Sequence, residues 1–304
     1  MKKVLSIVCL LLGTWLVIAC GSEAEATATT DTQEPVAETK EMRIVSLNGT
    51  ITELLFECGM GDKLVGVDVT STYPEAAQEL TNLGHTRQLN AEAILALKPT
   101  MILIDEQNAQ NKVLETIRNA GIDIHTISIP QQLDGILTAV KELETISEKT
   151  IDTKALADKI AKNTTEIEAL KAEQTEKPKV LFIYARGAQT MMVAGTNTFA
   201  EKMIEIAGGE SIVKEFESFK PLTPEALIQY QPDAILMFTS GLASLADETQ
   251  ELSGADQLFG MPGMEQTPAG KNKKVITMDG LYLSGFGPRS SDAALELAKQ
   301  LYPK

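Results

Sequence analysis

Two stretches of the sequence, residues 91–103 and 224–236, are similar to each other, and this internal repeat limits the folds open to the chain. They read AEAILALKPTMIL and PEALIQYQPDAIL, and the glutamate and the proline that they share lie at one offset of 133 positions. A looser match pairs GTIT at 49–52 with GTNT at 195–198. Two copies, and no more, predict two similar halves and exclude a solenoid.

Each half alternates apolar runs of strand length with stretches of helical character. The predicted strands are residues 43–47, 64–68, 101–104 and 122–127 and, opening the second half, 179–184. Strands that alternate with helices form mostly parallel sheets. Between the halves, residues 151–175 are rich in Ala, Lys, Glu and Leu and contain no Gly or Pro, which favours one long helix.

The first twenty residues have the features of an export signal. A basic MKK start precedes an apolar run that is too short for an ordinary membrane-spanning helix. The run ends in LVIACGS (16–22), which resembles the lipobox of bacterial lipoproteins and implies lipidation at Cys20; the alternative is a plain signal peptide with an incidental cysteine. Residues 21–41 are small, polar and acidic, as in a flexible tether. We expect an exported protein that is lipid-anchored to a bacterial membrane, with its folded part outside the cytoplasm.

These patterns together predict an α/β fold. Two Rossmann-like lobes with mostly parallel sheets are joined by one long α-helix, and a cleft lies between the lobes. Because a single helix is stiffer than crossing strands, little hinge closure is expected; the alternative is an ordinary surface helix. The predicted domains are a lipoprotein signal peptide (1–19), a flexible lipid-anchored tether (20–41), an N-terminal α/β lobe (42–150), an interlobe helix (151–175) and a C-terminal α/β lobe (176–304).

Composition and missing motifs exclude several functions. The formal net charge is -15, so a nucleic-acid partner, which needs a basic face, is not expected. Only two histidines are present, His85 and His125, so a zinc or manganese site of three histidines is impossible. The chain has no G-x-S-x-G motif, and Gly59 and Gly61 follow a predicted helix instead of opening one, so an enzyme is not expected. After removal of the signal and lipidation, Cys58 is the last free cysteine and no intramolecular disulfide can form.

The order of four motifs resembles one family over residues 43–301. RIVSLNGTITELLFECG, VGVDVTSTYP, LGHTRQLNAEAILALKPTMIL and the C-terminal LSGFGPR are similar to the haem-importing substrate-binding lipoproteins, within the larger group for cobalamin and iron-siderophores. The resemblance implies an extracytoplasmic component of an ABC importer that binds haem in the interlobe cleft. Haem would be its transported ligand, and its partners a permease dimer with ATPase subunits. A ferric siderophore or a cobalamin is the alternative ligand.

The same resemblance assigns an iron ligand. Many relatives carry a tyrosine ligand where this chain has His85, with a supporting arginine two residues on, here Arg87. Imidazole is a standard axial ligand of haem iron, so His85 is expected to ligate it; the alternative is a loop histidine that only forms hydrogen bonds. Binding through His85 should weaken as acid protonates the imidazole. His125 lies inside a predicted strand and is expected to be structural.

The second half offers further candidate contacts. Some relatives place a second axial histidine where this chain has Arg186, so bis-histidine ligation is not expected. Met191 or Met192 could supply a thioether, but methionine more often packs on apolar surface, here the porphyrin face. The other pocket residues or weaker ligand candidates are Tyr73, Tyr184, Tyr282 and Phe286.

The few arginines and two glutamates complete the predicted site. The two-lobe fold brings Arg87, Arg186 and Arg289 to the cleft, where guanidinium can pair with the haem propionates; Arg186 and Arg289 could instead be solvated at the surface. Glu92 and Glu225, which the repeat relates, match surface carboxylates that dock on the permease in this group. A symmetric permease requires such paired positions, although either residue alone could be an acid favoured in a first helical turn.

Overall fold

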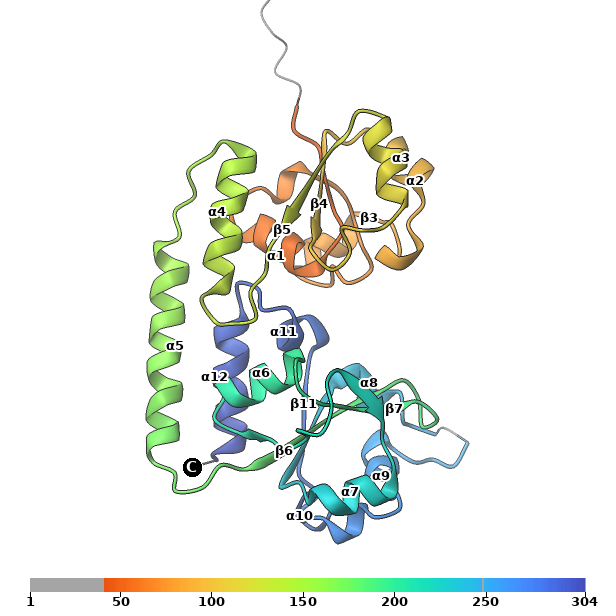
Figure 1. The fold of residues 1–304 in the computed structure, drawn as a ribbon, viewed down its shortest axis with the longest axis vertical. Coiled ribbons are helices and arrows are strands. Elements are labelled where there is room, and N and C mark those ends of the chain that lie inside the picture. The colour runs from red at the N-terminus through yellow and green to blue at the C-terminus, as the bar shows by residue number, and fades with distance from the viewer. Residues whose placement is uncertain (1–40, 248, 304) are drawn as a thin grey trace, which may run out of the picture. The chain divides into compact units, whose positions relative to one another are not determined.

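A computed structural model describes residues 41–247 and 249–303, all of which belong to one compact unit of the chain. The predicted signal peptide, Cys20 and the tether up to residue 40 lie outside the described residues. Within the described part, no helix is both long enough and apolar enough to cross a membrane. Figure 1 shows two α/β lobes, with helices beside them that connect one to the other.

Five parallel strands form the sheet of the N-terminal lobe, in the order β3-β2-β1-β4-β5. Every residue of the central strand β1 is buried, as in a parallel sheet that helices cover on both faces. The order is that of a Rossmann half, so the predicted fold is confirmed for this lobe. The strands are β1 (Ile44–Ser46), β2 (Leu64–Val67), β3 (Thr81–Asn82), β4 (Met101–Asp105) and β5 (Asp123–Ile127).

Helices and short 3-10 turns connect these strands. The first helix begins at Asn48, whose side chain accepts a hydrogen bond from the backbone N–H of Thr50 at 2.8 Å, the usual role of an N-cap. The α-helices are α1 (Gly49–Glu57), α2 (Ala91–Ala96), α3 (Val113–Asn119) and α4 (Gly135–Ser147). The 3-10 turns are Gly61–Lys63, Glu75–Glu79 and Thr86–Gln88.

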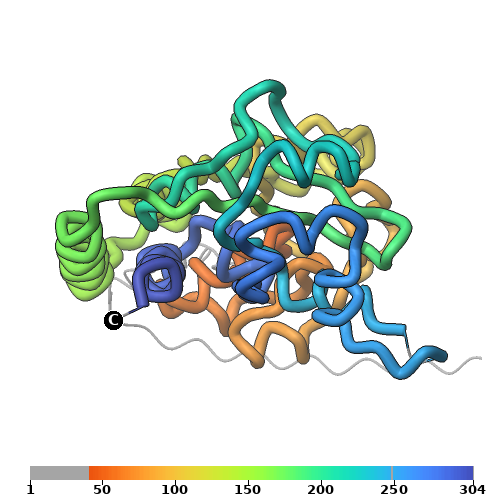
Figure 2. Tube along the Cα trace, turned by 90° about the horizontal axis from the view of Figure 1, so that it is seen from below, coloured from red at the N-terminus to blue at the C-terminus, as the bar shows by residue number. Residues whose placement is uncertain are grey.

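A long helix, α5 (Lys154–Ala172), follows α4 within the segment that the sequence predicts as the interlobe helix. Its buried side chains recur every three or four residues, the spacing of one helix face. Leu156 and Ile160 belong to the apolar core of the N-terminal lobe, and Ile167 and Leu170 belong to that of the C-terminal lobe. One helix therefore contributes to both cores. It runs beside the last helix of the chain, α12 (Ser290–Leu301) (Figure 2).

The sheet of the C-terminal lobe is mixed. Its order is β11-β10-β6-β7-β9, and β8 pairs with β6. Strands β6, β8, β10 and β11 are parallel, but β7 is antiparallel to β6 and to β9. The strands are β6 (Lys179–Ala185), β7 (Met191–Ala194), β8 (Glu210–Ser211), β9 (Phe219–Pro221), β10 (Ala234–Phe238) and β11 (Val275–Met278).

A tight hairpin explains this difference from the first lobe. The backbone N–H of Arg186 donates to the carbonyl of Thr190 at 2.9 Å, and Gly187 takes a positive φ of 77°. A loop this short can join only antiparallel strands, because a parallel pair needs a long crossover. The apolar run of the sequence predicts β6 but not the direction of the strand after it.

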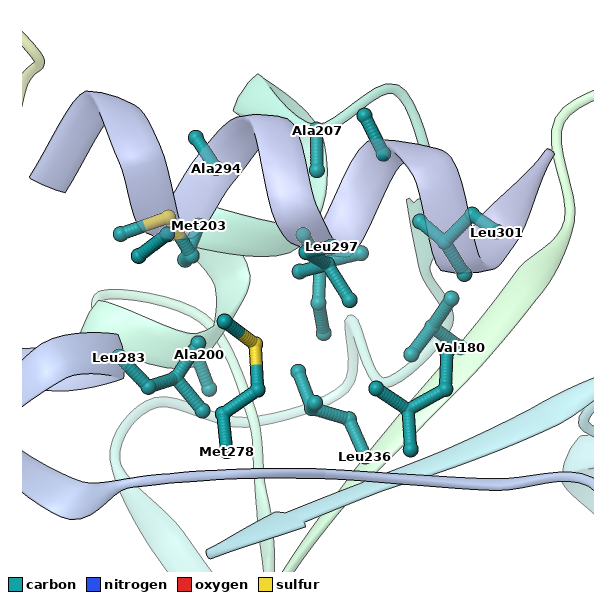
Figure 3. Close-up of a cluster of buried hydrophobic side chains, with 14 of the residues drawn as sticks. Val180, Ala200, Met203, Ala207, Leu236, Met278, Leu283, Ala294, Leu297 and Leu301 are labelled. Atoms are coloured by element: carbon teal, nitrogen blue, oxygen red, sulfur yellow. The ribbon is translucent and has the colours of Figure 1, made fainter. Parts of the chain in front are cut away.

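Apolar side chains from α12, from α6 and from the sheet fill the core of the C-terminal lobe. Figure 3 shows α12 above the sheet, with Leu297 pointing toward Leu236 and Met278, and α6 beside it. These side chains are fully or almost fully buried, and each such burial stabilises the fold by roughly 1.5–3 kcal/mol. The helices of this lobe are α6 (Phe199–Ile206), α7 (Pro224–Tyr230), α8 (Thr239–Ala243), α9 (Gly254–Phe259), α10 (Pro268–Lys271), α11 (Gly280–Ser284) and α12, with a 3-10 turn at Met264–Gln266.

Candidate functional site

A cleft with a cavity volume of about 1060 Å³ lies between the lobes. Small-molecule sites usually have volumes of ~300–1,000 Å³, so this one suits a large ligand. Its lining residues stand at the carboxyl ends of strands in both sheets: Asn48 follows β1, Asp105 ends β4, Arg186 follows β6 and Ser240 follows β10. Open α/β sheets bind ligands at this edge.

The wall formed by the N-terminal lobe is polar. Asp105 accepts hydrogen bonds from the side-chain amides of Asn48 (3.1 Å) and Asn108 (2.9 and 3.1 Å), and from two backbone N–H groups of the loop that follows it. Asn48 follows β1 and Asp105 ends β4, and these are the neighbouring strands at which the strand order reverses. This cluster is not among the residues predicted from the sequence, although Asn48 and Asp105 directly follow two predicted strands.

A buried network fixes the loop after β2. The carboxylate of Asp68 accepts hydrogen bonds from the hydroxyls of Thr70 (2.7 Å) and Ser71 (2.9 Å), and Thr70 in turn accepts from the backbone N–H of Gly49 at 2.9 Å. Burial raises the pKa of Asp68, although the hydroxyl donors act in the opposite direction. The network holds Thr70 and Thr72 in the cleft lining, beside the first turn of α1.

The wall formed by the C-terminal lobe is aromatic. Tyr184, Phe199, Phe219 and Phe238 line the cleft, and Phe182 lies beneath them in the core. Phe199 and Phe238 stack with ring centroids 5.6 Å apart, while Phe182 meets both edge-on at 5.2 Å. Such aromatic pairs stabilise one another beyond their burial and present flat apolar faces. Of these five residues, only Tyr184 is predicted from the sequence as part of the site.

The floor of the cleft joins the two lobes. The hydroxyl of Thr50, in α1, donates to the carbonyl of Gly285 at 2.9 Å, and both residues line the cavity. Phe286 also lines it, but only 1% of this residue is exposed, so it offers a ligand little surface. Its φ of +50° is rare for a bulky side chain.

His85 lies outside the cavity lining, on the rim of the N-terminal lobe after β3. It is exposed, and its Nδ1 accepts a hydrogen bond from the backbone N–H of Arg87 at 3.2 Å. Its loop is held against the cleft, because Thr86 donates to the side chain of Asn108 at 3.3 Å and Gly84 accepts from the backbone of Val69 at 3.0 Å. The imidazole is thus next to two cleft-lining segments and open to solvent.

The predicted cations separate into two groups. Arg186 lines the cleft, with its guanidinium 5.4 Å from the ring centroid of Tyr184, and it is the only basic residue among the described residues that do so. Arg87 is exposed near His85 on the rim. Arg289 lies outside the lining and forms a bidentate ion pair with Glu53, in place of the free guanidinium that a ligand carboxylate would need.

The other predicted residues are scattered around the cleft. Met191 and Met192 are half-buried on β7, where Met191 packs on the C-lobe core and not on the cavity. Tyr73 and Tyr282 flank Arg289, 3.5 and 5.1 Å from its guanidinium carbon, outside the cavity lining. His125 is half-buried within β5. Among the described residues, no group of three or more His, Cys, Asp or Glu is placed to hold a metal ion.

Glu92 and Glu225 occupy equivalent places in the two lobes. Each is the second residue of its helix, α2 or α7, two positions after an N-cap residue whose side chain binds the first turn. Both are exposed. The sequence repeat therefore corresponds to a repeat in structure, with one surface carboxylate on each lobe.

The chain matches the periplasmic binding protein family over residues 44–282, and it belongs to that family. The apo structure of the periplasmic heme-binding protein RhuT from Roseiflexus sp. RS-1 is similar, with a TM-score of 0.77 and 37% identity over 86% of this chain and 98% of that one. An ABC transporter substrate-binding lipoprotein of Bacillus subtilis (strain 168), YvrC, is 25% identical over 89% of this chain and 83% of its own length. A vitamin B12-binding protein of Vibrio campbellii (strain ATCC BAA-1116) is 30% identical over 64% and 69%, respectively.

These similarities define the class of protein. It is an extracytoplasmic solute-binding component of an ABC importer and not an enzyme. The expected family and the absence of an enzymatic role are confirmed. The relatives named above differ in their ligands, so the ligand of this chain has to be argued from its own cleft.

Proposed function

We propose that the protein captures haem in the interlobe cleft and delivers it to its permease. The observation that carries this proposal is the pairing of an aromatic wall with one cation among the described lining residues, in a cavity of about 1060 Å³. Tyr184, Phe199, Phe219 and Phe238 suit one face of a porphyrin, and Arg186 at the edge of that wall suits a propionate. The similar Roseiflexus protein is described as heme-binding, which supports the same ligand.

His85 is the proposed axial ligand, and Arg87 its supporting residue. The hydrogen bond from the Arg87 N–H needs a lone pair on Nδ1, so the neutral ring carries its proton on Nε2. Ligation through Nε2 requires that proton to sit on Nδ1, and ligation through Nδ1 uses the same lone pair. In either case His85 loses its hydrogen bond with the Arg87 N–H when it binds the iron, and the loss costs about 1 kcal/mol of binding free energy.

Three further roles belong to the same proposal. Cys20 carries the lipid anchor, and Glu92 and Glu225 dock on the permease dimer. Of the remaining candidates, Tyr73 and Tyr282 pack against the guanidinium of Arg289 and Met191 packs on the C-lobe core, so these residues and Met192 are assigned to the surroundings of the cleft and not to iron ligation.

A cobalamin is the second candidate, and one observation favours it. The N-terminal wall carries several side-chain amides, Asn48, Gln107, Asn108 and Gln131, which could bind the amide groups of a corrin ring. The Vibrio campbellii relative is described as vitamin B12-binding.

The decisive experiment is a titration of the chain from Glu41 onward with hemin, followed by the Soret band, beside titrations with cyanocobalamin and a ferric siderophore. The variants are His85→Ala and, as a matched control, His125→Ala, which removes the other histidine. We expect hemin to bind, the Soret band to shift in His85→Ala, and His125→Ala to behave like the wild type. Binding of cobalamin or siderophore without hemin would overturn the haem assignment, whereas an unchanged spectrum of His85→Ala would exclude only that ligand.

A further inference from the structure

An ion pair joins the two lobes beside the floor of the cleft. Glu53 lies on α1 in the N-terminal lobe, and Arg289 precedes α12 in the C-terminal lobe. The Nε and Nη2 atoms of Arg289 each donate to a different carboxylate oxygen of Glu53, and both distances are 2.9 Å. This is the bidentate geometry in which guanidinium fixes the orientation of a carboxylate as well as its distance.

The pair is shielded from solvent. The side chain of Glu53 is 5% exposed and that of Arg289 is 22% exposed. The guanidinium carbon lies 3.5 Å from the ring centroid of Tyr73, which comes from the N-terminal lobe, and 5.1 Å from that of Tyr282, which comes from the C-terminal lobe. One cation is thus contacted by both lobes through three side chains. Partly desolvated pairs of this kind couple more strongly than exposed ones.

The surrounding backbone fits closely around this contact. Thr50, one turn before Glu53, donates to the carbonyl of Gly285. A Cβ on Gly285 would come within 2.7 Å of the Thr50 hydroxyl, and a Cβ on Gly287 would lie 3.2 Å from its methyl group. One turn of α1 and the short segment 285–289 therefore form a close contact between the lobes.

We propose that the pair between Glu53 and Arg289 is an interlobe latch that sets the spacing of the two cleft walls. Glu53 and Arg289 are then positioning residues, which act on ligand capture without touching the ligand. The latch holds the aromatic wall at a fixed distance from the polar wall, so the cleft has nearly its binding width before a ligand arrives. A binding site that is already formed loses less entropy on binding and releases its ligand more slowly.

The bidentate geometry requires a planar guanidinium at position 289 and a charged carboxylate at position 53. Lysine cannot replace the planar fork of arginine, so Arg289→Lys keeps the charge and loses the orientation. Glutamine at position 53 keeps the shape and removes the charge that Arg289 needs. Because each single change leaves a shielded group without its partner, the reversed pair, Glu53→Arg with Arg289→Glu, should recover part of the loss.

The test measures lobe spacing directly, in the ligand-free chain from Glu41. Spin labels on Glu115→Cys in α3 and Gln229→Cys in α7, with Cys58→Ser to remove the native thiol, report the distance between the lobes. We expect one narrow distance distribution in the parent and a broader one in Glu53→Gln and in Arg289→Lys. The reversed pair should be narrower than either single variant, and Glu142→Gln, whose carboxylate binds the backbone of Ser128 within one lobe, should match the parent.

The second readout is ligand release, and it rests on the proposed haem function. Hemin transfer from the unlabelled variants to excess apomyoglobin should be about tenfold faster in both single variants, the scale of coupling for a close charge pair, and slower again in the reversed pair. Unchanged distances in a folded Glu53→Gln or Arg289→Lys would overturn the latch, as would broadened distances with unchanged hemin release. If hemin does not bind at all, the haem proposal fails and the ligand-free distances still decide on the latch.

Discussion

The two walls of the cleft are built on the same α/β plan but carry different chemistry. In the N-terminal lobe, Asn48, Asp105 and Asn108 form a hydrogen-bonded polar surface. In the C-terminal lobe, Phe199, Phe219 and Phe238 form an aromatic surface. Beneath them lies Phe182, which is buried in β6. Asn48 follows β1 and Asp105 ends β4, whereas in the C-terminal lobe Phe238 ends β10, Phe199 begins α6 and Phe219 begins β9.

Two lobes with the same fold can therefore present different chemistry to one ligand. The strands of both sheets are apolar and interchangeable in character, since their task is to fill a core. The residues that follow the strands are free of that task, so one lobe can present hydrogen-bonding groups and the other flat apolar faces. A ligand that is itself apolar on its faces and polar at its edges suits such a pair of walls.

The largest expected effect comes from removing the support of the aromatic wall. Phe182→Ala should lower the free energy of unfolding by about 3–5 kcal/mol, because the buried ring contacts three other rings and leaves a cavity. Urea denaturation followed by circular dichroism measures this loss. Phe182→Leu is the control and should lose only about 1.5 kcal/mol. Equal stability of Phe182→Ala and the wild type would show that the wall does not depend on the ring beneath it.

A smaller loss of stability is expected when Asp105, the acceptor at the centre of the polar wall, is replaced. Asp105→Ala should lower the free energy of unfolding by about 2–3 kcal/mol, because the Asn48 and Asn108 amides and two backbone N–H groups lose their acceptor. The same denaturation experiment applies. Asp105→Asn keeps one acceptor oxygen and should lie between the alanine variant and the wild type; a loss as large as that of Asp105→Ala would contradict the role of that oxygen.

Arg186 gives the C-terminal wall of the cleft a positive charge. Arg186→Gln should weaken hemin binding about tenfold, because a charge-assisted hydrogen bond to a propionate is lost. Arg118→Gln, an exposed arginine on α3 away from the cleft, should bind hemin like the wild type. Hemin dimethyl ester, which lacks the carboxylates, should bind both variants equally well. If the ester shows the same tenfold difference, Arg186 acts through the aromatic wall and not through charge.

The last prediction uses the one free thiol of the described residues, Cys58, which reports on the N-terminal lobe alone and not on the cleft. Burial, and to a lesser extent the carboxylates of Glu57 and Glu144, raise the pKa of this thiol to about 11. The thiolate is the reactive form, so alkylation at pH 8 should be roughly 100-fold slower than for an ordinary cysteine and should accelerate as the pH rises toward that pKa. Iodoacetamide labelling followed by mass spectrometry gives the rates. Rapid labelling at pH 8 would mean that the end of α1 opens readily.

Much of the fold could be predicted because it depends on local patterns. Apolar runs such as MILID and AILMF, each following a short helical stretch that ends near a proline, are typical of buried strands, and the repeat between 91–103 and 224–236 shows that the two lobes share them. The direction of β7 could not be predicted, since the hairpin at Gly187 sets it and the apolar pattern is the same for both directions.

The candidate site was less predictable for a related reason. Phe199, Phe219 and Phe238 come from three separate segments, and only the tertiary fold stacks them. The partner of Arg289 is 236 positions away on α1, so its charge looked available for a ligand. By contrast, the family resemblance points to His85 in the loop at 84–90 and to Arg186 in the loop after the strand at 179–184, and in the structure the first lies on the rim and the second in the lining.

The floor of the cleft limits how binding proteins of this kind can change their ligand. A methyl group on Gly49 would lie 2.3 Å from a backbone oxygen of Thr70, and one on Gly285 would lie 2.6 Å from that of Leu281, so neither position accepts a side chain without moving the backbone. Substitutions that alter specificity are therefore restricted to the walls and the rim, where side chains can be exchanged one at a time. Descendants of one ancestral cleft can in this way diverge toward different chelates while the junction between their lobes stays the same.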